Sequence, residues 1–289
     1  MKTTKVLRNM LNEPGLIIAP GGFSPLTARI AEKVGYKCCY MSGYGVAAFR
    51  CGFPDIGLMT MNESLDNARA MALACSIPII ADVDNGYGNA LSVERTVREY
   101  ENAGVAAIQI EDQAWPKRCG HMEGKILITE EEMVQKIKMA VRTREDEDFL
   151  IIARTDANTV AGFEEAVKRS KAYAEAGADM IFFESPTTRE QVEQVPKLID
   201  KPIMVNMSEG AKTPLFSNAD LDAMGYKLVI WPSTATWAAA KAVQDVYEIL
   251  MNKGTMEEDL DKIMLFHEFN NLIGLPEMME KAKQYGIDK

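Results

Sequence analysis

Short apolar runs recur along the whole chain, and amphipathic stretches separate them. Each run is apolar throughout and does not alternate with polar residues, which is typical of strands buried on both faces of a parallel sheet. The eight runs cover residues 16–19, 38–41, 77–83, 106–110, 150–153, 180–183, 203–205 and 228–231. The pattern therefore predicts an α/β protein with eight parallel strands.

The stretches between the runs carry apolar residues every three to four positions, as helices packed on a sheet do. The clearest of them cover residues 25–34, 61–74, 93–103, 130–142, 163–176 and 236–251. Gly104, Gly177 and Gly225 each stand just before a strand, where a left-handed helix end is expected. Eight such units in about 250 residues match a closed TIM-type (β/α)8 barrel with additional C-terminal helices.

An open doubly wound sheet is the alternative, because no sequence pattern shows closure directly. A glycine-rich dinucleotide fingerprint would favour it, but residues 42–45 and 85–88 lack the third glycine. We interpret residues 1–289 as one barrel domain, with the barrel at about 10–250 and a helical extension at about 255–289. An acidic, Met-rich helix is predicted for residues 256–269, and Pro276 opens another. These helices serve either an oligomer contact or packing on their own barrel.

The composition excludes several classes of partner. A net charge of -10 and a pI near 4.9 leave no basic face for a phosphate backbone, so nucleic acid is not expected. The N-terminus lacks an apolar signal core, and no apolar run approaches about 18 residues, which predicts a cytoplasmic protein without a membrane partner. The five cysteines (Cys38, Cys39, Cys51, Cys75 and Cys119) lack the paired spacing of zinc sites, and most of them are interpreted as reduced core residues.

Polar residues gather just after the apolar runs, where a parallel barrel places its catalytic groups. They occupy positions 21–24, 42–45, 82–85, 111–112, 154–156, 184–185 and 206–209. One rim of the barrel is therefore expected to collect several carboxylates, an arginine and small amide or hydroxyl donors.

Asp82 and Asp84 are two residues apart, so on a strand their carboxylates point to the same side, and Glu111 ends the neighbouring strand. Such hard oxygen ligands suit Mg²⁺ or Mn²⁺. Magnesium keeps several waters, so one direct aspartate with the other acids acting through water is sufficient. The alternative is that these acids cap the next helices or pair with Arg154.

Residues 113–126 form a long polar segment with the composition of a mobile lid. Lys117, Arg118 and His121 lie around Cys119, and cations lower a thiol pKa, so we expect Cys119 to have a lowered pKa. It would then act near neutral pH as a proton donor or a nucleophile, the alternative being an ordinary loop cysteine. Cys119 and His121 are only two residues apart, whereas nucleophilic pairs come from distant segments, so proton transfer is favoured. His267 is interpreted as a structural or surface residue.

Six short motifs closely resemble the isocitrate lyase/phosphoenolpyruvate mutase superfamily, and the resemblance spans roughly residues 10–250. They are YMSG at 40–43, PDIG at 54–57, DVD at 82–84, IEDQ at 110–113, KRCGH at 117–121 and ARTD at 153–156. The KRCGH block is specific to the lyase branch, and the Asn-containing gating loop of the phosphonate-forming mutases is absent. A lyase is therefore favoured over a mutase.

The resemblance implies a (β/α)8 barrel, often with its eighth helix exchanged between subunits, that forms a homotetramer and depends on Mg²⁺. The implied metal ligands are Asp84, directly, and Asp55, Asp82 and Glu111 through water. The implied ligands of the α-hydroxy carboxylate are Ser42, Gly43, Tyr44 and Arg154, and those of the other carboxylate are Asn206, Ser208, Gly120 and His121.

The same resemblance implies the chemistry of a retro-aldol cleavage. Loss of the hydroxyl proton from a metal-bound substrate breaks a carbon–carbon bond and leaves an α-keto acid and a carboxylate-stabilised carbanion. Cys119 would be the general acid that protonates this carbanion, and Arg154 would stabilise its developing charge. Tyr40, or Glu111 through water, would be the base.

Two positions depart from the methylisocitrate lyases, which have an arginine after the Cys-Gly-His triplet and another after the eighth strand. This chain has Met122 at the first position and no arginine in residues 231–237. A buried carboxylate without partners costs several kcal/mol, so a tricarboxylate fits poorly. We therefore expect cleavage of 2,3-dimethylmalate to pyruvate and propionate, with Met122, Trp237 and Leu215 as an apolar pocket.

Three alternatives remain at this point. Two are enzymes of the same superfamily, a methylisocitrate lyase that forms pyruvate and succinate and an oxaloacetate hydrolase. The third is a non-catalytic barrel that binds a metal or a carboxylate. That third alternative gives no reason for a proton donor on a glycine-flanked loop.

Overall fold

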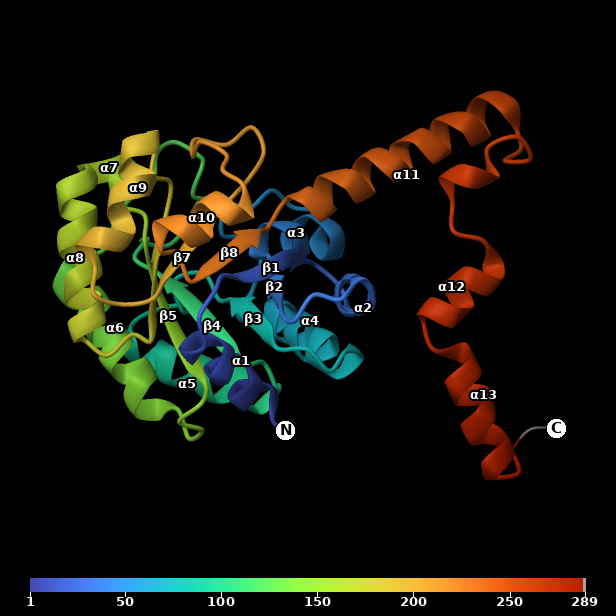
Figure 1. Ribbon diagram of the computed structural model, residues 1–289, viewed down its shortest axis with the longest axis horizontal. Coiled ribbons are helices and arrows are strands. Elements are labelled where there is room, and N and C mark those ends of the chain that lie inside the picture. Colours follow the sequence, from blue (N-terminus) through green and yellow to red (C-terminus); the bar gives the residue numbers. More distant parts are fainter. Residues whose placement is uncertain (288–289) are drawn as a thin grey trace. The chain divides into compact units, whose positions relative to one another are not determined.

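The computed structural model describes residues 1–287, and its eight parallel strands close into a barrel (Figure 1). The strands are β1 (Ile17–Gly22), β2 (Cys39–Met41), β3 (Ile79–Asp82), β4 (Ala107–Glu111), β5 (Leu150–Thr155), β6 (Met180–Phe183), β7 (Ile203–Asn206) and β8 (Leu228–Trp231). β1 pairs in parallel with β8, from Ile17 opposite Leu228 to Pro20 opposite Trp231. This pairing confirms the closed barrel and excludes the open sheet.

One helix, α1 (Thr3–Asn12), precedes the first strand, and the other helices of the barrel follow strands around its outside (Figure 1). These are α2 (Pro25–Val34), α3 (Gly43–Val46), the π-helix η1 (Ala47–Cys51), α4 (Met61–Ala74), α5 (Ala90–Asn102), α6 (Glu130–Thr143), α7 (Asn158–Ala161), α8 (Phe163–Glu175), α9 (Arg189–Leu198) and α10 (Asn218–Met224). Ser24 and Thr60 begin α2 and α4 at the predicted residues, since each side chain accepts a hydrogen bond from the third backbone N–H of its helix.

The core of the barrel is closed at the end where the strands begin. Leu7 and Leu11 of α1 are buried in one hydrophobic cluster with Ile17, Leu150 and Leu228, the first residues of three strands. Apolar side chains therefore fill that end of the barrel. The carboxyl ends of the strands are left for polar groups, as expected for this architecture.

The chain divides into two compact units, Met1–Thr234 and the residues from Ala235 onward. The second unit contains most of α11 (Thr234–Lys253), a 3-10 turn (Leu260–Lys262), α12 (Phe266–Leu272) and α13 (Leu275–Gln284). The prediction of one helix over residues 256–269 is wrong, because α-helix begins only at Phe266. Asp259 instead accepts hydrogen bonds from the ammonium groups of Lys253 (2.7 Å) and Lys262 (2.8 Å), contacts that hold a turn.

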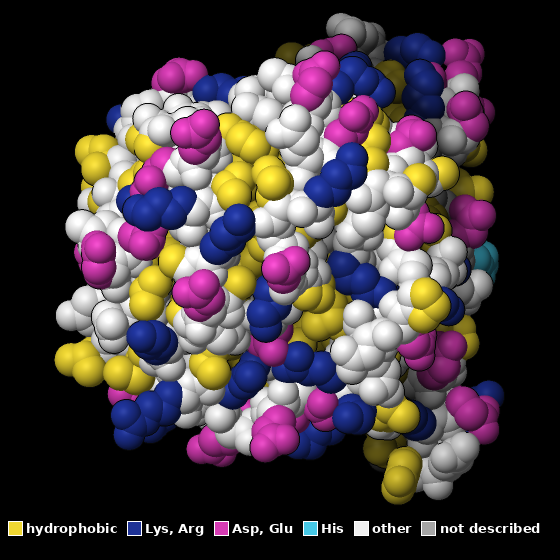
Figure 2. All heavy atoms as spheres, turned by 60° about the vertical axis from the view of Figure 1, so that its left-hand side comes forward, with side chains coloured by type: hydrophobic (Ala, Val, Ile, Leu, Met, Phe, Trp, Pro, Cys, Tyr) yellow, Lys and Arg dark blue, Asp and Glu magenta, His cyan; other side chains and the backbone are white. Residues whose placement is uncertain are grey.

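Among the helices of residues 1–287, none has the length and hydropathy needed to cross a membrane. On the face drawn in Figure 2, Lys and Arg side chains are interspersed with Asp and Glu side chains. All five cysteines are free thiols, but only Cys38 and Cys39 are buried in the core as predicted, and Cys51, Cys75 and Cys119 are partly exposed.

Candidate functional site

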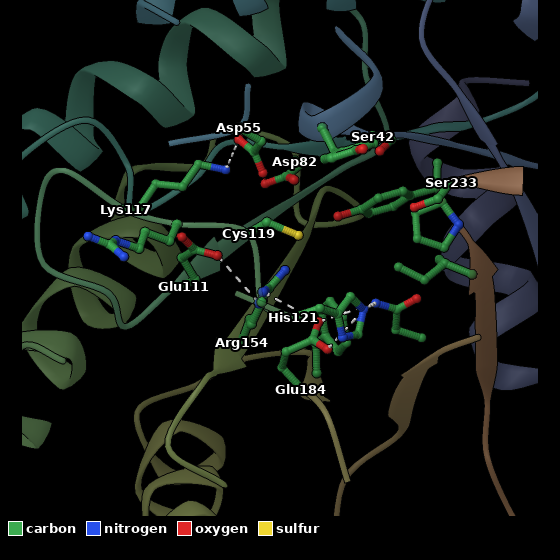
Figure 3. A pocket seen from close by; sticks show the side chains of 18 residues that line it. Ser42, Asp55, Asp82, Glu111, Lys117, Cys119, His121, Arg154, Glu184 and Ser233 are labelled. Carbon is green, nitrogen blue, oxygen red and sulfur yellow. Dashed lines mark hydrogen bonds and ion pairs between the residues drawn. The ribbon is translucent and has the colours of Figure 1, made fainter. Parts of the chain in front are cut away.

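A cavity of about 40 Å³ lies at the carboxyl ends of the strands, among residues from most of the barrel and from the loop after β4 (Figure 3). Its lining consists of Tyr40, Ser42, Tyr44, Asp55, Asp82, Glu111, Lys117, Arg118, Cys119, Gly120, His121, Arg154, Phe182, Glu184, Asn206, Ile230, Pro232 and Ser233. Of the residues predicted for the site, all but Gly43, Asp84 and Ser208 line this cavity. A volume of about 40 Å³ holds one or two waters, so a six-carbon acid enters only when lining groups move.

The three predicted residues outside the lining stand directly behind it. The Gly43 backbone N–H donates to Asp82 Oδ2 (3.3 Å), and the Ser208 hydroxyl donates to Ser233 Oγ (3.3 Å). Asp84 is buried and pairs with the Lys117 ammonium (2.7 Å). Each of the three therefore contacts a residue that lines the cavity.

Lys117 places a positive charge among the predicted metal ligands (Figure 3). Its Nζ lies 2.5 Å from Asp55 Oδ1 and 2.7 Å from Asp84 Oδ1. Burial alone would lower the pKa of Lys117, but Asp84 and Asp55 raise it well above its ordinary value. Burial raises the pKa of Asp84 to about 6, although Lys117 opposes that rise. A cation is thus held at this position by aspartates from two separate segments.

The backbone at Asp84 lies in the left-handed region, with φ 50°, which non-glycine residues rarely adopt. The Asp84 N–H donates to Asp82 Oδ1 (3.1 Å), and the Glu111 N–H donates to the Asp84 carbonyl (2.9 Å). This turn brings Asp82, Asp84 and Glu111 together as predicted. Within residues 1–287, no three His, Cys, Asp or Glu side chains are arranged to hold a metal ion directly.

Arg154 is surrounded by carboxylates. It makes two hydrogen bonds to Asp156 (2.9 and 3.1 Å), and it lies 3.4 Å from both Glu111 Oε2 and Glu184 Oε2. Burial would raise the pKa of Asp156, but Arg154 and Lys125 outweigh it and hold that pKa well below its ordinary value. The guanidinium is therefore fixed in place while its remaining edge lines the cavity.

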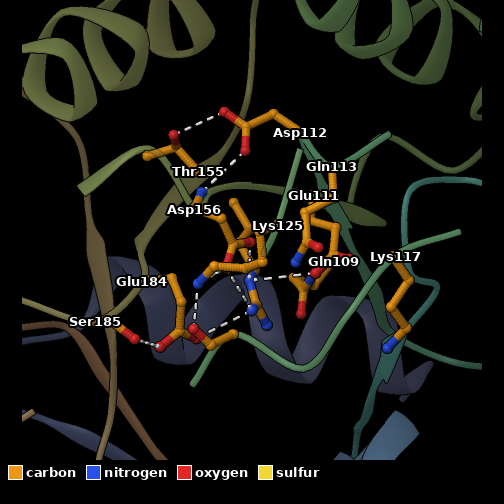
Figure 4. Close-up of polar contacts among 12 residues, drawn as sticks. Gln109, Glu111, Asp112, Gln113, Lys117, Lys125, Thr155, Asp156, Glu184 and Ser185 are labelled. Atoms are coloured by element: carbon orange, nitrogen blue, oxygen red, sulfur yellow. Dashed lines mark hydrogen bonds and ion pairs between the residues drawn. The ribbon is translucent and has the colours of Figure 1, made fainter. Parts of the chain in front are cut away.

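Asp112 supports the end of β5, which carries Arg154 and leads into Asp156 (Figure 4). Its carboxylate accepts hydrogen bonds from the Thr155 hydroxyl (2.7 Å), the Asp156 N–H (2.9 Å) and the Tyr173 hydroxyl (2.8 Å). These contacts tie the end of β4 to the end of β5, and so set the position of Arg154.

The loop after β4 is docked on the barrel by its own cations. The Lys125 ammonium is buried, donates to the Gly120 carbonyl and pairs with Asp156 (3.1 Å; Figure 4). Gln113 donates to the Arg118 carbonyl (2.8 Å) and accepts from the Arg118 N–H (2.9 Å). The loop composition indicated a lid, but the roles of Lys125 and Gln113 as anchors were not predicted.

Gly120 is the point of closest approach between this loop and the barrel. A Cβ at this position would lie 2.3 Å from Arg154 Nη2 and 2.8 Å from Glu184 Cγ. Only glycine allows the docked position, since any side chain would push the loop off these two residues.

The prediction of a lowered pKa for Cys119 is wrong. Burial and the nearby Asp55 carboxylate raise the pKa of Cys119 to about 11, and the smaller effects of Lys117 and Arg154 oppose that rise without reversing it. The thiol therefore keeps its proton at neutral pH. A protonated thiol suits a general acid and not a nucleophile.

The two predicted bases differ in their surroundings. The Tyr40 hydroxyl donates to Gln109 Oε1 (2.7 Å), and burial with Asp82 raises the pKa of Tyr40 well above its ordinary value. Burial also raises the pKa of Glu111, against the opposing effect of Arg154, and Glu111 Oε1 is a buried atom without a hydrogen-bond partner. Of the two, Glu111 has a side-chain oxygen without a hydrogen-bond partner, whereas the Tyr40 hydroxyl is bound to Gln109.

His121 lies at the opposite side of the cavity from the aspartates (Figure 3). Its Nε2 is 3.1 Å from Asn206 Nδ2, its Nδ1 is 3.2 Å from Ser185 Oγ, and Glu184 Oε1 is 3.9 Å from Nε2. Neither Glu184 nor Ser185 was assigned a role from the sequence. Their position just after the sixth strand was the signal that could have identified them.

The apolar part of the lining differs from the prediction. Phe182, Ile230 and Pro232 line the cavity, whereas Met122 and Leu215 do not. Met122 is on the loop, and its N–H donates to the Cys119 carbonyl (2.8 Å). Trp237 belongs to the second unit. The apolar surface comes from strand ends, which a pattern of loop residues does not reveal.

Two relatives match the chain over nearly its full length. It is 46% identical over 289 residues to a 2,3-dimethylmalate lyase of Eubacterium barkeri, which is all of both chains. It is 44% identical over 269 residues to a 2-methylisocitrate lyase of Aeropyrum pernix, covering 93% of this chain and 86% of that protein.

Solved structures match the fold closely. A crystal structure of 2,3-dimethylmalate lyase gives a TM-score of 0.94 at 38% identity and covers 99% of this chain and 96% of that one. The structure of oxaloacetate acetylhydrolase with the inhibitor 3,3-difluorooxalacetate gives a TM-score of 0.94 at 34% identity and covers 99% of this chain and 97% of that one. The structure of phosphonopyruvate hydrolase with oxalate and Mg²⁺ gives a TM-score of 0.90 at 32% identity and covers 99% of each chain.

A family model described as phosphoenolpyruvate phosphomutase matches residues 7–251, which include the whole barrel and every residue that lines the cavity. Together with the relatives and structures above, this match shows that the chain belongs to the phosphoenolpyruvate mutase/isocitrate lyase superfamily.

Proposed function

We propose that the protein is a Mg²⁺-dependent lyase that cleaves 2,3-dimethylmalate to pyruvate and propionate. The observation that carries the proposal is the protonated Cys119 thiol, which a docked loop holds at a cavity containing Arg154 and several carboxylates. The choice of substrate is supported by the 2,3-dimethylmalate lyase that is 46% identical along the whole chain. It is also supported by Phe182, Ile230 and Pro232, apolar groups suited to methyl substituents.

The donor set fits a hard divalent cation. Lys117 already places a positive charge against Asp55 and Asp84, and Glu111 Oε1 is a buried oxygen without a partner. Asp84, Asp82, Asp55 and Glu111 would hold the metal, directly or through water. When bound, Mg²⁺ would supply positive charge that stabilises the substrate α-carboxylate and the oxygen of its hydroxyl group.

The remaining lining groups would bind the two carboxylates of the substrate. Arg154, with Ser42, Gly43 and Tyr44, would hold the α-hydroxy carboxylate, and fixed donors of this kind cost little reorganisation. Asn206 and His121, with Gly120 and Ser208, would hold the other carboxylate. The bond between C2 and C3 then lies between these two groups of residues.

Proton transfer completes the reaction. Glu111 accepts the hydroxyl proton, the C2–C3 bond breaks to give pyruvate, and the electron pair remains on C3 beside its carboxylate. The Cys119 thiol then donates its proton to C3, which gives propionate. The raised pKa of Glu111 favours proton uptake, and the raised pKa of Cys119 ensures that the thiol carries a proton to give.

The proposal also includes a cytoplasmic location and a homotetrameric assembly. Tyr247, Met251 and Phe266 of the second unit are exposed, and large exposed apolar side chains are common where subunits meet. Light scattering on the purified protein tests the assembly, and a monomer would contradict it.

The substrate is tested directly by release of the keto acid. With Mg²⁺ and 2,3-dimethylmalate, the purified protein should form pyruvate and propionate in equal amounts, and removal of the metal by chelation should abolish turnover until Mg²⁺ is restored. Pyruvate can be followed with coupled lactate dehydrogenase. Rapid pyruvate release from methylisocitrate, with none from dimethylmalate, would overturn the choice of substrate.

Replacement of the acid should slow turnover but leave binding intact. We expect Cys119→Ser to lower kcat by about 10³-fold, within the usual range for a lost general acid, while dimethylmalate still binds in calorimetry. In the unmodified enzyme the thiol donates only when protonated, so the rate should hold at neutral pH and fall as the pH rises through about 11. A fall below the ordinary thiol pKa of 9.0 would contradict the raised pKa.

Docking of the loop is tested at Gly120. Because a Cβ there collides with Arg154 and Glu184, Gly120→Ala should lower kcat/KM by about 100-fold through misplacement of Cys119 and His121. Glu123→Ala is the matched control, since Glu123 is on the same loop, is exposed and pairs only with Lys212 within the described residues. An unchanged kcat/KM in Gly120→Ala would show that the docked loop is not the catalytic state.

A further inference from the structure

Ser185 is a buried residue at the end of β6 that connects a carboxylate with the His121 ring. Its hydroxyl donates to Glu184 Oε1 (2.7 Å; Figure 4), and Ser185 Oγ also lies 3.2 Å from His121 Nδ1. On the other side of the ring, Asn206 Nδ2 lies 3.1 Å from Nε2. Both ring nitrogens therefore have a partner from the barrel, although His121 itself is on the loop.

These contacts determine which ring nitrogen of His121 carries a proton. A serine hydroxyl has one hydrogen, and that of Ser185 points to the Glu184 carboxylate, which can only accept. Toward His121 the Ser185 oxygen must therefore accept, so Nδ1 carries the hydrogen. Nε2 is then the unprotonated nitrogen and accepts from the Asn206 amide.

The orientation of the Asn206 amide agrees with this assignment. Asn206 Nδ2 also donates to Glu184 Oε2 (3.4 Å), so the NH₂ end faces both the carboxylate and the ring. The opposite orientation would point the amide oxygen at a carboxylate, which is repulsive. One directed chain of hydrogen bonds thus runs from Asn206 through His121 and Ser185 to Glu184.

The backbone of Ser185 has a strained conformation. Its φ is 53°, in the left-handed region that non-glycine residues seldom adopt, and its carbonyl accepts a hydrogen bond from Asn158 Nδ2 (2.5 Å). Strain of this kind persists where the surrounding structure holds it, and it is concentrated at functional positions. The strained turn places the hydroxyl between Glu184 and His121.

We infer that Ser185 is a positioning residue that holds His121 in the Nδ1–H tautomer, with Nε2 accepting from the Asn206 amide at the cavity. The Nδ1–H bond to Ser185 fixes the ring, and Nε2 in turn fixes the Asn206 amide, which lines the cavity. His121 and Asn206 are thus held in place for an incoming carboxylate. This role rests on the proposed function only in naming that carboxylate as the substrate's.

Nitrogen NMR of the protein labelled with [¹⁵N]histidine tests the tautomer without substrate. The chain has two histidines, and the exposed His267 of α12 is an internal reference. In the wild-type enzyme at neutral pH, His121 should show a protonated Nδ1 and an unprotonated Nε2. In Ser185→Ala this preference should be lost, and the KM for dimethylmalate should rise about tenfold while kcat changes less than about threefold.

Two further variants separate the hydroxyl from other effects. Ser185→Gly also removes the hydroxyl but relieves the strained φ, so it should reproduce the loss of tautomer preference. Ser170→Ala is the matched control, since the Ser170 hydroxyl is buried and bonds to the Ala166 carbonyl within α8. It should leave the His121 spectrum and KM unchanged.

The outcomes distinguish this inference from the proposed function. A protonated Nε2 in the wild type, or an unchanged Nδ1–H tautomer in both Ser185 variants, would overturn the role of Ser185. A lost tautomer preference with an unchanged KM would support that role and instead contradict contact between His121 and the substrate. Absence of lyase activity would contradict the proposed function, and the NMR result would still decide the tautomer.

Discussion

The carboxyl end of this barrel depends on three buried cations that compensate a concentration of buried acids. Lys117 pairs with Asp55 and Asp84, Lys125 pairs with Asp156, and Arg154 lies among Asp156, Glu111 and Glu184. Removing one partner of such a buried pair typically costs about 3–5 kcal/mol. Two of the three cations belong to the loop after β4. The ion pairs that dock this loop therefore also neutralise acids at the barrel rim.

That coupling explains the state of the catalytic groups. In the docked loop, Cys119 is enclosed beside Asp55, and its pKa is raised to about 11. The same loop places His121 between Ser185 and Asn206. The cavity is about 40 Å³, so lining groups must move before a six-carbon acid can enter. The positions of Cys119, the proposed proton donor, and of His121 thus depend on the ion pairs of Lys117 and Lys125.

The sequence predicts the fold well because its signals are local. Apolar runs, helix caps and glycines at helix ends are set by neighbouring residues, and residues 25–34 and 61–74 form helices with the predicted bounds. The site was predicted only in outline. The thiol pKa depends on burial and on Asp55, some sixty residues away in sequence, and the place of Ser208 behind Ser233 depends on packing between two strands. Such distant contacts leave no periodic pattern.

The central claim is that one fixed donor on the docked loop delivers the proton to C3. Cleavage of 2,3-dimethylmalate in D₂O, followed by stereochemical analysis of the propionate, tests it most directly. We expect propionate that carries one deuterium at C2 in a single configuration, because Cys119 reaches the carbanion from one side. Propionate with deuterium in both configurations in equal amounts would show protonation by free solvent and would contradict the claim.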